Sequence, residues 1–160
     1  MVTFTAIHIE NFKRFCGEHS IPLSGKGKIN VIAAENGVGK TTVLDAFYLA
    51  LHGKKGIKMR KSESDFHFAD WLANAFSSAG KLNHGYMEVG VKLDMEAPEL
   101  GYESISVARK YWIHPDSHEL TSDLNLHIDG TILKIERGEN KEQVIRAWME
   151  ALVPPAITQR

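Results

Sequence analysis

The stretch from residue 34 to residue 42, Ala-Glu-Asn-Gly-Val-Gly-Lys-Thr-Thr, constrains the fold of this chain more than any other. It follows a short apolar run, residues 29–33, and leads into a longer apolar segment, residues 43–51. That order predicts a strand, a glycine-bearing loop and a helix. The spacing matches the P-loop pattern G-x-x-x-x-G-K-[ST], except that Ala34 replaces the first glycine. Such a loop surrounds a phosphate chain with backbone N–H groups at a helix N-terminus.

Each residue type in this segment has a physical role in phosphate binding. Gly37 and Gly39 let the backbone turn tightly and approach the phosphates. Lys40 is expected to place its ammonium group on the β- and γ-phosphates, and the Thr41 hydroxyl is expected to ligate Mg²⁺. We therefore predict ATP and Mg²⁺ as cofactors and Lys40 and Thr41 as the catalytic residues. The predicted nucleotide contacts in the loop are Asn36, Gly37, Val38, Gly39, Lys40, Thr41 and Thr42.

An ordinary Asn-Gly turn followed by a capped helix is the alternative interpretation of this segment. The preceding strand, the following helix and the Gly39-Lys40-Thr41 tripeptide in register favour the nucleotide site instead.

Length and composition indicate one globular domain, residues 1–160, or one part of a larger one, because apolar residues make up 43% and charged residues 24%. No apolar run is long enough to span a membrane, and no secretory signal precedes the first strand. Cys16 is the one cysteine, which excludes an internal disulfide. These features predict a cytoplasmic protein without a membrane partner.

Charge is distributed unevenly along the chain. Residues 1–61 carry ten lysines and arginines against four acids, whereas residues 62–160 carry nine against sixteen. The densest basic run, residues 54–61, is predicted to be a loop. It is open to two interpretations: a contact with the phosphate backbone of DNA, or a solvated loop that complements a helix C-terminus.

Strands and helices are predicted on both sides of the P-loop in the first half of the chain. Pro22 suggests that the second strand lies at a sheet edge or stops there, and the strand before the P-loop is apolar enough to be central. Ser64 is the expected cap of the second helix, and Gly80 its end. The elements are strands over residues 2–10, 18–23 and 28–34, a P-loop helix over 40–52 within a P-loop unit of about 28–53, and a helix over 65–79.

The second half reads as an antiparallel meander over about residues 84–135, followed by a helix. Residues 87–95 alternate apolar and polar, which indicates a half-buried strand, and residues 105–113 are its expected antiparallel partner. A tight hairpin is predicted around Asp129-Gly130, with strands over 124–128 and 131–135. The final helix spans about residues 140–152.

The order of these elements excludes simple kinases and small GTPases, which place the P-loop after the first strand. Here two strands precede the loop and a meander follows the first helical unit. The fold class expected is α/β (α+β): the N-terminal lobe of an ABC-type ATPase head, with a P-loop core and an antiparallel or mixed β-sheet.

Several segments resemble a known family. Residues 7–15, residues 35–42 and residues 43–53 are similar to the N-terminal head of SMC-like DNA-repair ATPases of the SbcC and RecF kind. Residues 66–76, 89–93, 107–112 and 152–157 are similar, in that order, to DndD, the ATPase family of bacterial DNA phosphorothioation systems. The resemblance covers nearly the whole chain.

The resemblance implies partners that this sequence does not contain. In such heads the N-terminal lobe packs against a C-terminal lobe to which a long antiparallel coiled coil joins it, and two heads sandwich ATP. The chain has no coiled-coil heptads and no Walker B, signature or switch motif, so it resembles an N-terminal fragment. The partners implied are its own C-terminal lobe, a second head in an ATP-dependent homodimer, DNA, and other phosphorothioation or repair subunits.

The resemblance also implies further site residues. Lys13 and Arg14 match the basic residues with which family heads contact nucleotide; a solvated turn is the alternative. A Q-loop glutamine that helps to hold Mg²⁺ is expected past the meander, where Gln159 and Gln143 both lie. A separate metal site at His114 and His118 is disfavoured, because zinc usually needs a third protein ligand.

Two functions remain open at this point. One is a motor-like ATPase head in which ATP binding drives dimerisation and hydrolysis resets it, with DNA acted on or sensed. The other is a nucleotide-gated DNA- or protein-binding module with little turnover. The isolated fragment is expected to bind nucleotide weakly and to hydrolyse little.

Overall fold

A single antiparallel sheet with helices on one face forms the framework of the protein. The computed structural model describes residues 2–23, 38–61 and 66–153. Its strands are β1 (Thr3–Phe12), β2 (Phe15–Pro22), β3 (Met87–Ala97), β4 (Tyr102–Ile113), β5 (Leu120–Ile128) and β6 (Thr131–Ile132). Its helices are α1 (Val38–His52), α2 (Lys54–Lys61), α3 (Phe68–Ala75) and α4 (Lys141–Leu152), with a short 3₁₀ turn at Pro98–Leu100.

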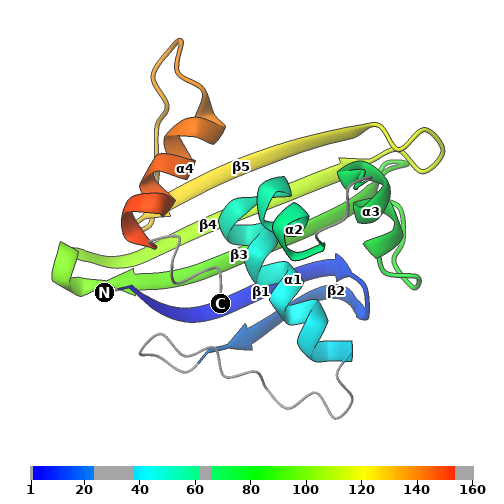
Figure 1. Cartoon of the computed structure of the whole chain (residues 1–160), viewed down its shortest axis with the longest axis horizontal. Coiled ribbons are helices and arrows are strands. Elements are labelled where there is room, and N and C mark those ends of the chain that lie inside the picture. Colours follow the sequence, from blue (N-terminus) through cyan, green and yellow to red (C-terminus); the bar gives the residue numbers. More distant parts are fainter. Residues whose placement is uncertain (1, 24–37, 62–65, 154–160) are drawn as a thin grey trace.

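The six described strands pair in the order β2-β1-β3-β4-β5-β6, and every pair is antiparallel. Figure 1 shows the helices on the same face of this sheet, with α1 crossing the strands near the centre and α4 beside β5. Among the described strands, β2 lies at one edge of the sheet and ends at Pro22, which agrees with both predicted alternatives. The mixed α/β architecture agrees with the expected fold class, and the described part of the sheet is antiparallel rather than mixed.

The hydrophobic core lies between the sheet and the helices. Along β4, buried and partly exposed residues alternate, because successive side chains of a strand point to opposite faces. From α1, Ala46, Leu49 and Ala50 are fully buried against the strands. The inward residues of β1, β3 and β4 that meet them include Ile7, Ile9, Leu93 and Val107.

Two predicted elements appear with little change. Asp129 and Gly130 have φ values of 50° and 82°, the left-handed conformations that a type I′ hairpin turn requires. The strand after this turn is shorter than expected, because β6 ends at Ile132. Asn140 caps α4 through a hydrogen bond that its side chain accepts from the backbone N–H of Gln143.

The prediction of a basic loop over residues 54–61 is wrong, because these residues form helix α2. Gly53, with φ of 63°, reverses the chain at the end of α1. Gly56 and Ile57 are buried, and a Cβ at Gly56 would lie only 2.5 Å from the backbone oxygen of Tyr48 in α1. Helix α2 therefore packs closely against α1 at Gly56, where the absence of a side chain lets the two backbones approach each other.

The predicted helix over residues 65–79 is too long. In the structure α3 ends at Ala75, and Phe76 has ψ of 135°, outside the helical range. The backbone N–H of Ser77 donates to Asn11 O at 2.9 Å, so the chain pairs with the end of β1 instead of continuing the helix. The expected cap Ser64 and the expected strand over 28–34 lie outside the described residues.

Candidate nucleotide-binding site

The first turn of α1 is the described part of the predicted P-loop. This helix begins at Val38 and has no acidic residue in its first turn. The first N–H groups of a helix lack partners within the helix, and the helix dipole is positive at this end, so both features favour an anion. The other predicted contacts in this turn are Gly39, Lys40, Thr41 and Thr42. The predicted ligands outside the described residues are Asn36, Gly37 and Gln159.

Lys13 and Arg14 lie in the tight turn between β1 and β2. Asn11 and Lys13 both have φ of 53°. The Asn11 side chain fixes the turn, because its oxygen accepts from the backbone N–H of Gly17 at 2.8 Å and its amide donates to Glu88 O at 3.2 Å. The turn therefore has a defined shape, with Arg14 exposed and Lys13 directed toward α1.

A buried carboxylate on α1 gathers three cations. Asp45 is fully buried, and its Oδ2 accepts from Lys13 Nζ at 2.8 Å and from Lys61 Nζ at 3.1 Å. Its Oδ1 accepts from Arg60 Nε at 2.7 Å. We call these four residues the Asp45 cluster. One side chain thus ties α1 to both the β1–β2 turn and α2.

Aromatic rings cover the cations of this cluster. Lys13 Nζ lies 5.9 Å and Lys61 Nζ 5.7 Å from the ring centre of Trp71, and Arg60 lies 5.2 Å from the ring centre of Tyr48. These distances fall within the range of cation–π attraction. The rings leave 24–29% of the three cationic side chains exposed, so the ion pairs are only partly shielded from water.

The electrostatic balance of the Asp45 cluster favours the charged carboxylate. Burial pushes the pKa of Asp45 upward, but hydrogen bonds from Lys13 and Arg60 outweigh burial and hold the pKa below its ordinary value. The carboxylate is therefore ionised at neutral pH. Three positive charges then meet one negative charge, and the cluster keeps a positive excess close to the helix that carries the P-loop lysine.

An open groove of about 510 Å³ lies beside the turn that carries Lys13 and Arg14. Asn74 and Ser77, from the end of α3 and the segment after it, line the opposite side. Among the described residues that line this groove there is no acid. Its polarity and charge suit a phosphate-bearing ligand.

Sequence reasoning missed Asp45. The signal for it was a single acid inside an otherwise apolar helix, residues 43–51. A buried charge is costly unless it is paired, so such an acid indicates that cations lie nearby. The partners themselves come from three separate parts of the chain, and only the fold brings them together.

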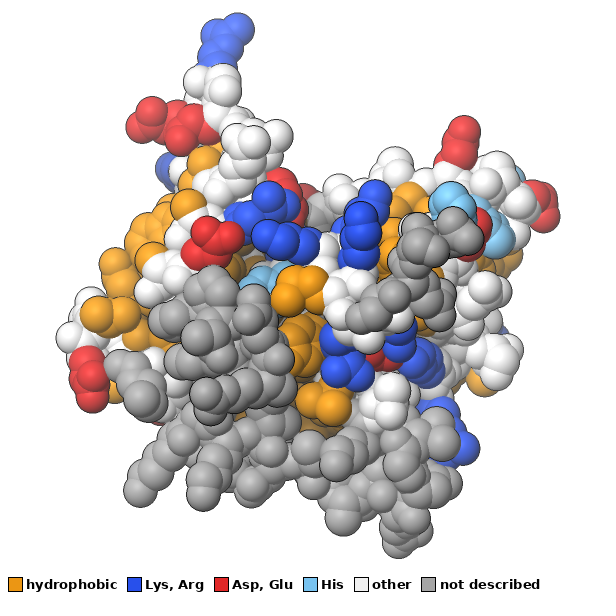
Figure 2. Space-filling model, viewed as in Figure 1, with side chains coloured by type: hydrophobic (Ala, Val, Ile, Leu, Met, Phe, Trp, Pro, Cys, Tyr) orange, Lys and Arg blue, Asp and Glu red, His pale blue; other side chains and the backbone are white. Residues whose placement is uncertain are grey.

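The basic residues of α2 divide into two groups. Arg60 and Lys61 face the Asp45 cluster, whereas Lys54, Lys55 and Lys58 are exposed. Figure 2 shows lysine and arginine side chains gathered over this part of the helix-bearing face. The basic run therefore contributes both to internal ion pairing and to an exposed positive surface.

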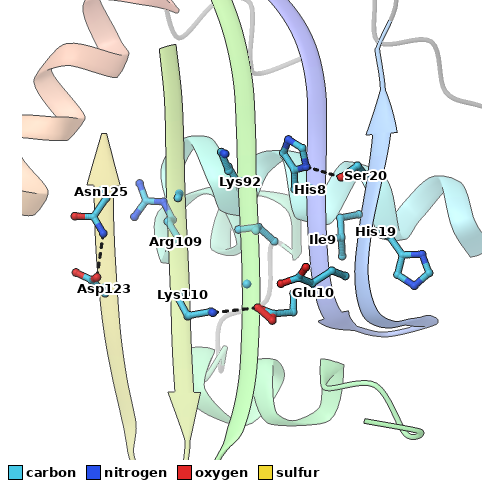
Figure 3. A pocket seen from close by; sticks show the side chains of 14 residues that line it. His8, Ile9, Glu10, His19, Ser20, Lys92, Arg109, Lys110, Asp123 and Asn125 are labelled. Carbon is cyan, nitrogen blue, oxygen red and sulfur yellow. Dashed lines mark hydrogen bonds and ion pairs between the residues drawn. The ribbon is translucent and has the colours of Figure 1, made fainter. Parts of the chain in front are cut away.

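The opposite face of the sheet carries a polar hollow of about 430 Å³, drawn in Figure 3. His8 bridges two strands there: its Nδ1 lies 2.7 Å from Ser20 Oγ and its Nε2 lies 2.6 Å from Asp94 Oδ2. Lys110 pairs with Glu10 at 3.3 Å. His8 thus links β1 to its neighbours β2 and β3, whereas Lys110 of β4 reaches across β3 to Glu10 of β1.

Hydrogen bonds hold both His114 and His118 in place. His114 Nδ1 accepts hydrogen bonds from the backbone N–H groups of Asp116 and Ser117, and His118 Nδ1 lies 2.8 Å from Asp70 Oδ1. Within the part of the chain that the structure describes, no group of three histidine, cysteine or acidic side chains is placed to hold a metal ion.

Comparison with known proteins places this site in context. Residues 6–150 match the family described as AAA domain. A solved structure described as "Structural biochemistry of ATP-driven dimerization and DNA stimulated activation of SMC ATPases" is similar in fold, with a TM-score of 0.58 and 17% sequence identity. The match covers 96% of this chain and 82% of that chain. No curated protein matches the sequence.

Among residues 2–23, 38–61 and 66–153, no helix is both long enough and apolar enough to cross a bilayer.

Proposed function

Since this chain belongs to the AAA domain family, we propose that it is the ATP-binding lobe of an SMC-like ATPase head. The observation that carries this proposal is the G-x-G-K-T sequence at the start of α1, whose first turn is free of acids. The similarity in fold to an SMC ATPase structure supports the same assignment of the lobe. ATP and Mg²⁺ are the ligands that this site requires.

In the proposed site the loop amides and Lys40 hold the phosphates, and the Thr41 hydroxyl ligates Mg²⁺. Lys13 and Arg14 contact the nucleotide from the β1–β2 turn, and Gln159 is the proposed further Mg²⁺ ligand. The positive excess of the Asp45 cluster and the acid-free groove beside Arg14 support a polyanionic ligand on this side of α1.

ATP binding drives two heads together, and hydrolysis separates them, in this proposal. The single lobe lacks the Walker B and signature residues, so it binds nucleotide weakly and hydrolyses little until a C-terminal lobe and a second head complete the site. A nucleotide-gated binding module with little turnover is the second candidate, since it requires the same loop.

DNA is the proposed macromolecular partner, in DNA modification, restriction or repair. The exposed lysines of α2 support a nucleic-acid partner, and the resemblance of residues 66–76 and 107–112 to DndD supports a phosphorothioation system and its other subunits. A cytoplasmic location goes with this proposal and with the single cysteine.

The test replaces Lys40 by alanine in the full-length protein and measures ATP affinity by titration with a fluorescent analogue. Loss of a hydrogen bond to a charged group costs about 1.5–3 kcal/mol, so affinity should fall roughly 10- to 100-fold. Lys134→Ala is the matched control, because Lys134 is exposed and follows β6, at the opposite end of the strand order from β2. Equal ATP affinity in wild type and Lys40→Ala refutes the P-loop assignment.

Head association is measured separately by light scattering. The full-length protein should change from monomer to dimer with ATP and remain monomeric with ADP. If ATP binds but the mass does not change and turnover stays negligible, the gated binding module becomes the better account of this protein.

A further inference from the structure

Asp45 lies between the two parts of the proposed nucleotide site, the start of α1 and the β1–β2 turn. It is fully buried on α1, four residues after Thr41, the predicted Mg²⁺ ligand. Residues four apart lie on the same face of a helix, and four residues of helix rise by about 6 Å. The carboxylate is therefore close to the end of α1 that carries Lys40.

Through Lys13 this carboxylate reaches the β1–β2 turn. Asp45 Oδ2 accepts from Lys13 Nζ at 2.8 Å. The ring centres of Phe12 and Trp71 lie 5.6 and 5.9 Å from the same ammonium group. The backbone at Lys13 is also fixed, since its N–H donates to Ala75 O at 2.5 Å and its φ is 53°. Lys13 is thus held both at its backbone and at its charged end.

The position of Arg14 depends on this anchor. Arg14 follows Lys13 directly, its side chain is exposed, and both residues line the groove of about 510 Å³. Consecutive Cα atoms are about 3.8 Å apart, so the backbone of Arg14 cannot move away from α1 while Lys13 is held. The Lys13 ammonium has three N–H donors and 29% of the side chain is exposed, so it can contact a ligand without leaving Asp45.

Stability alone does not account for a charge at residue 45. Loss of hydration offsets much of the attraction between buried charges, so a protein in which apolar residues of similar volume replace a buried ion pair is often equally stable or more stable. The neighbours of Asp45 on α1 include Ala46 and Leu49, which are apolar and fully buried. An apolar residue would suit this environment, but only a carboxylate fixes the positions of cationic partners.

We propose that Asp45 is a positioning residue of the nucleotide site: through Lys13 it holds the β1–β2 turn, and with it Arg14, in place beside the start of α1. This inference rests on the proposed function, because it requires that ATP binds there. Asp45 has no exposed surface, so it acts only through the two basic residues of the turn.

Charge and position predict opposite effects of Asp45→Asn on ATP binding. The lowered pKa of Asp45 keeps its carboxylate ionised, so asparagine adds one net positive charge to the Asp45 cluster. Attraction between charges alone would then bind the polyanionic nucleotide more tightly. If Asp45 positions the turn, ATP binding becomes weaker instead, because the released side chains must be ordered each time a ligand binds.

Titration with a fluorescent ATP analogue measures the affinity of the full-length protein, at a temperature where circular dichroism shows each variant to be folded. Asp45→Asn should weaken binding roughly three- to tenfold, the cost of ordering one flexible side chain. Arg109→Met is the control, because it also removes a buried charge in contact with α1, at Ala50 O and Leu51 O in the last turn of the helix. The control should leave ATP affinity unchanged.

A second comparison separates positioning from a general distortion of α1. In a protein that already carries Lys13→Met/Arg14→Ala, Asp45→Asn should cause no further loss of ATP affinity, because the residues through which it acts are gone. A distortion of α1 would lower the affinity in both backgrounds, since Arg60 and Lys61 still contact residue 45. An equal loss in both backgrounds therefore overturns the inference.

Hydrogen exchange tests the link between Lys13 and Asp45 without a ligand. Lys13→Met leaves Asp45 paired with Arg60 and Lys61, so this variant serves even where Asp45→Asn does not fold. The amides of residues 12–17 should then exchange roughly 10- to 100-fold faster, as expected for the loss of a hydrogen bond to a charged group. Arg60→Met, which removes another cation of the cluster, should leave these amides unchanged. Equal exchange in wild type and folded Lys13→Met overturns the inference.

The Lys40→Ala titration separates this inference from the proposed function. If Lys40→Ala loses ATP affinity while Asp45→Asn binds ATP as tightly as wild type or more tightly, the P-loop assignment stands and the positioning role is wrong. If Lys40→Ala binds ATP as wild type does, the nucleotide site itself is wrong, and the positioning role is refuted with it.

Discussion

Replacement of Asp45 by asparagine should destabilise the protein more than replacement of any exposed acid. Removal of one partner from a buried ion pair costs about 3–5 kcal/mol, because uncompensated charge stays behind. Lys13, Arg60 and Lys61 keep 24–29% of their side chains exposed, so water recovers part of that cost. We therefore expect a loss near the lower limit, about 3 kcal/mol, which corresponds to a fall in melting temperature of roughly 6–12 °C for a chain of this size.

Urea unfolding followed by far-ultraviolet circular dichroism measures this loss. Asp123→Asn is the matched control, because Asp123 also pairs with a cation, Lys141, but its side chain is 50% exposed. Surface pairs contribute at most about 1 kcal/mol. The two variants make the same chemical change, so the difference between their losses in free energy of unfolding measures the effect of burial.

The pH dependence supplies a second check on Asp45. Its pKa is lowered in the folded protein, so its stabilising charge is fully present above the ordinary value of 3.8 and is lost as pH falls through the folded value. Wild type and Asp45→Asn should therefore converge in stability at acidic pH. Equal stability at pH 7, or a difference that persists unchanged in acid, would refute the account of the cluster.

Three further changes test other parts of the fold. Arg109→Met should cost about 2 kcal/mol in urea unfolding, because the buried guanidinium donates to Ala50 O at 2.9 Å and its loss leaves that carbonyl without a partner. Gly56→Ala should destabilise the protein by about 1–3 kcal/mol, because the new Cβ would clash with the backbone oxygen of Tyr48. In a helix without this contact, alanine is more favourable than glycine by about 1 kcal/mol. A gain in stability would therefore contradict the close packing of α2 on α1. Burial raises the pKa of Tyr111 to about 12, so ultraviolet titration should show a tyrosine that ionises at this high pH, and Tyr111→Phe should lack this step. Because the unfolded chain ionises Tyr111 near its ordinary value of 10.0, the stability of the wild type should fall as pH rises above that value.

Local chemistry made the regular elements predictable. Alternating residues in β3 and β4 and the Asp129-Gly130 turn each define their structure within a few residues. The cap at Asn140 is equally local. The position of helix α1 was predictable for the same reason, because the segment that marks its start is a contiguous stretch.

The failures came from tertiary contacts that no local pattern encodes. The end of α3 depends on Asn11, more than sixty positions earlier in the chain, which accepts a hydrogen bond from Ser77. Residues 54–61 were predicted to be a solvated loop because five of the eight are lysine or arginine. Their helical structure depends on the burial of Gly56 and Ile57, which the local sequence does not indicate. The roles of Lys13 and Arg60 around Asp45 likewise follow only once the sheet brings their segments together.

Arg109 couples the movement of helix α1 to that of helix α4. It extends from the central strand β4, donates to Ala50 O and Leu51 O at the end of α1, and pairs with Glu142 in the first turn of α4. A sliding movement of either helix along its own axis would break contacts that hold the other. The two helices and the strand beneath them should therefore shift as one rigid unit, so that a displacement of the first turn of α1 is transmitted to α4 without any change in the loops between them.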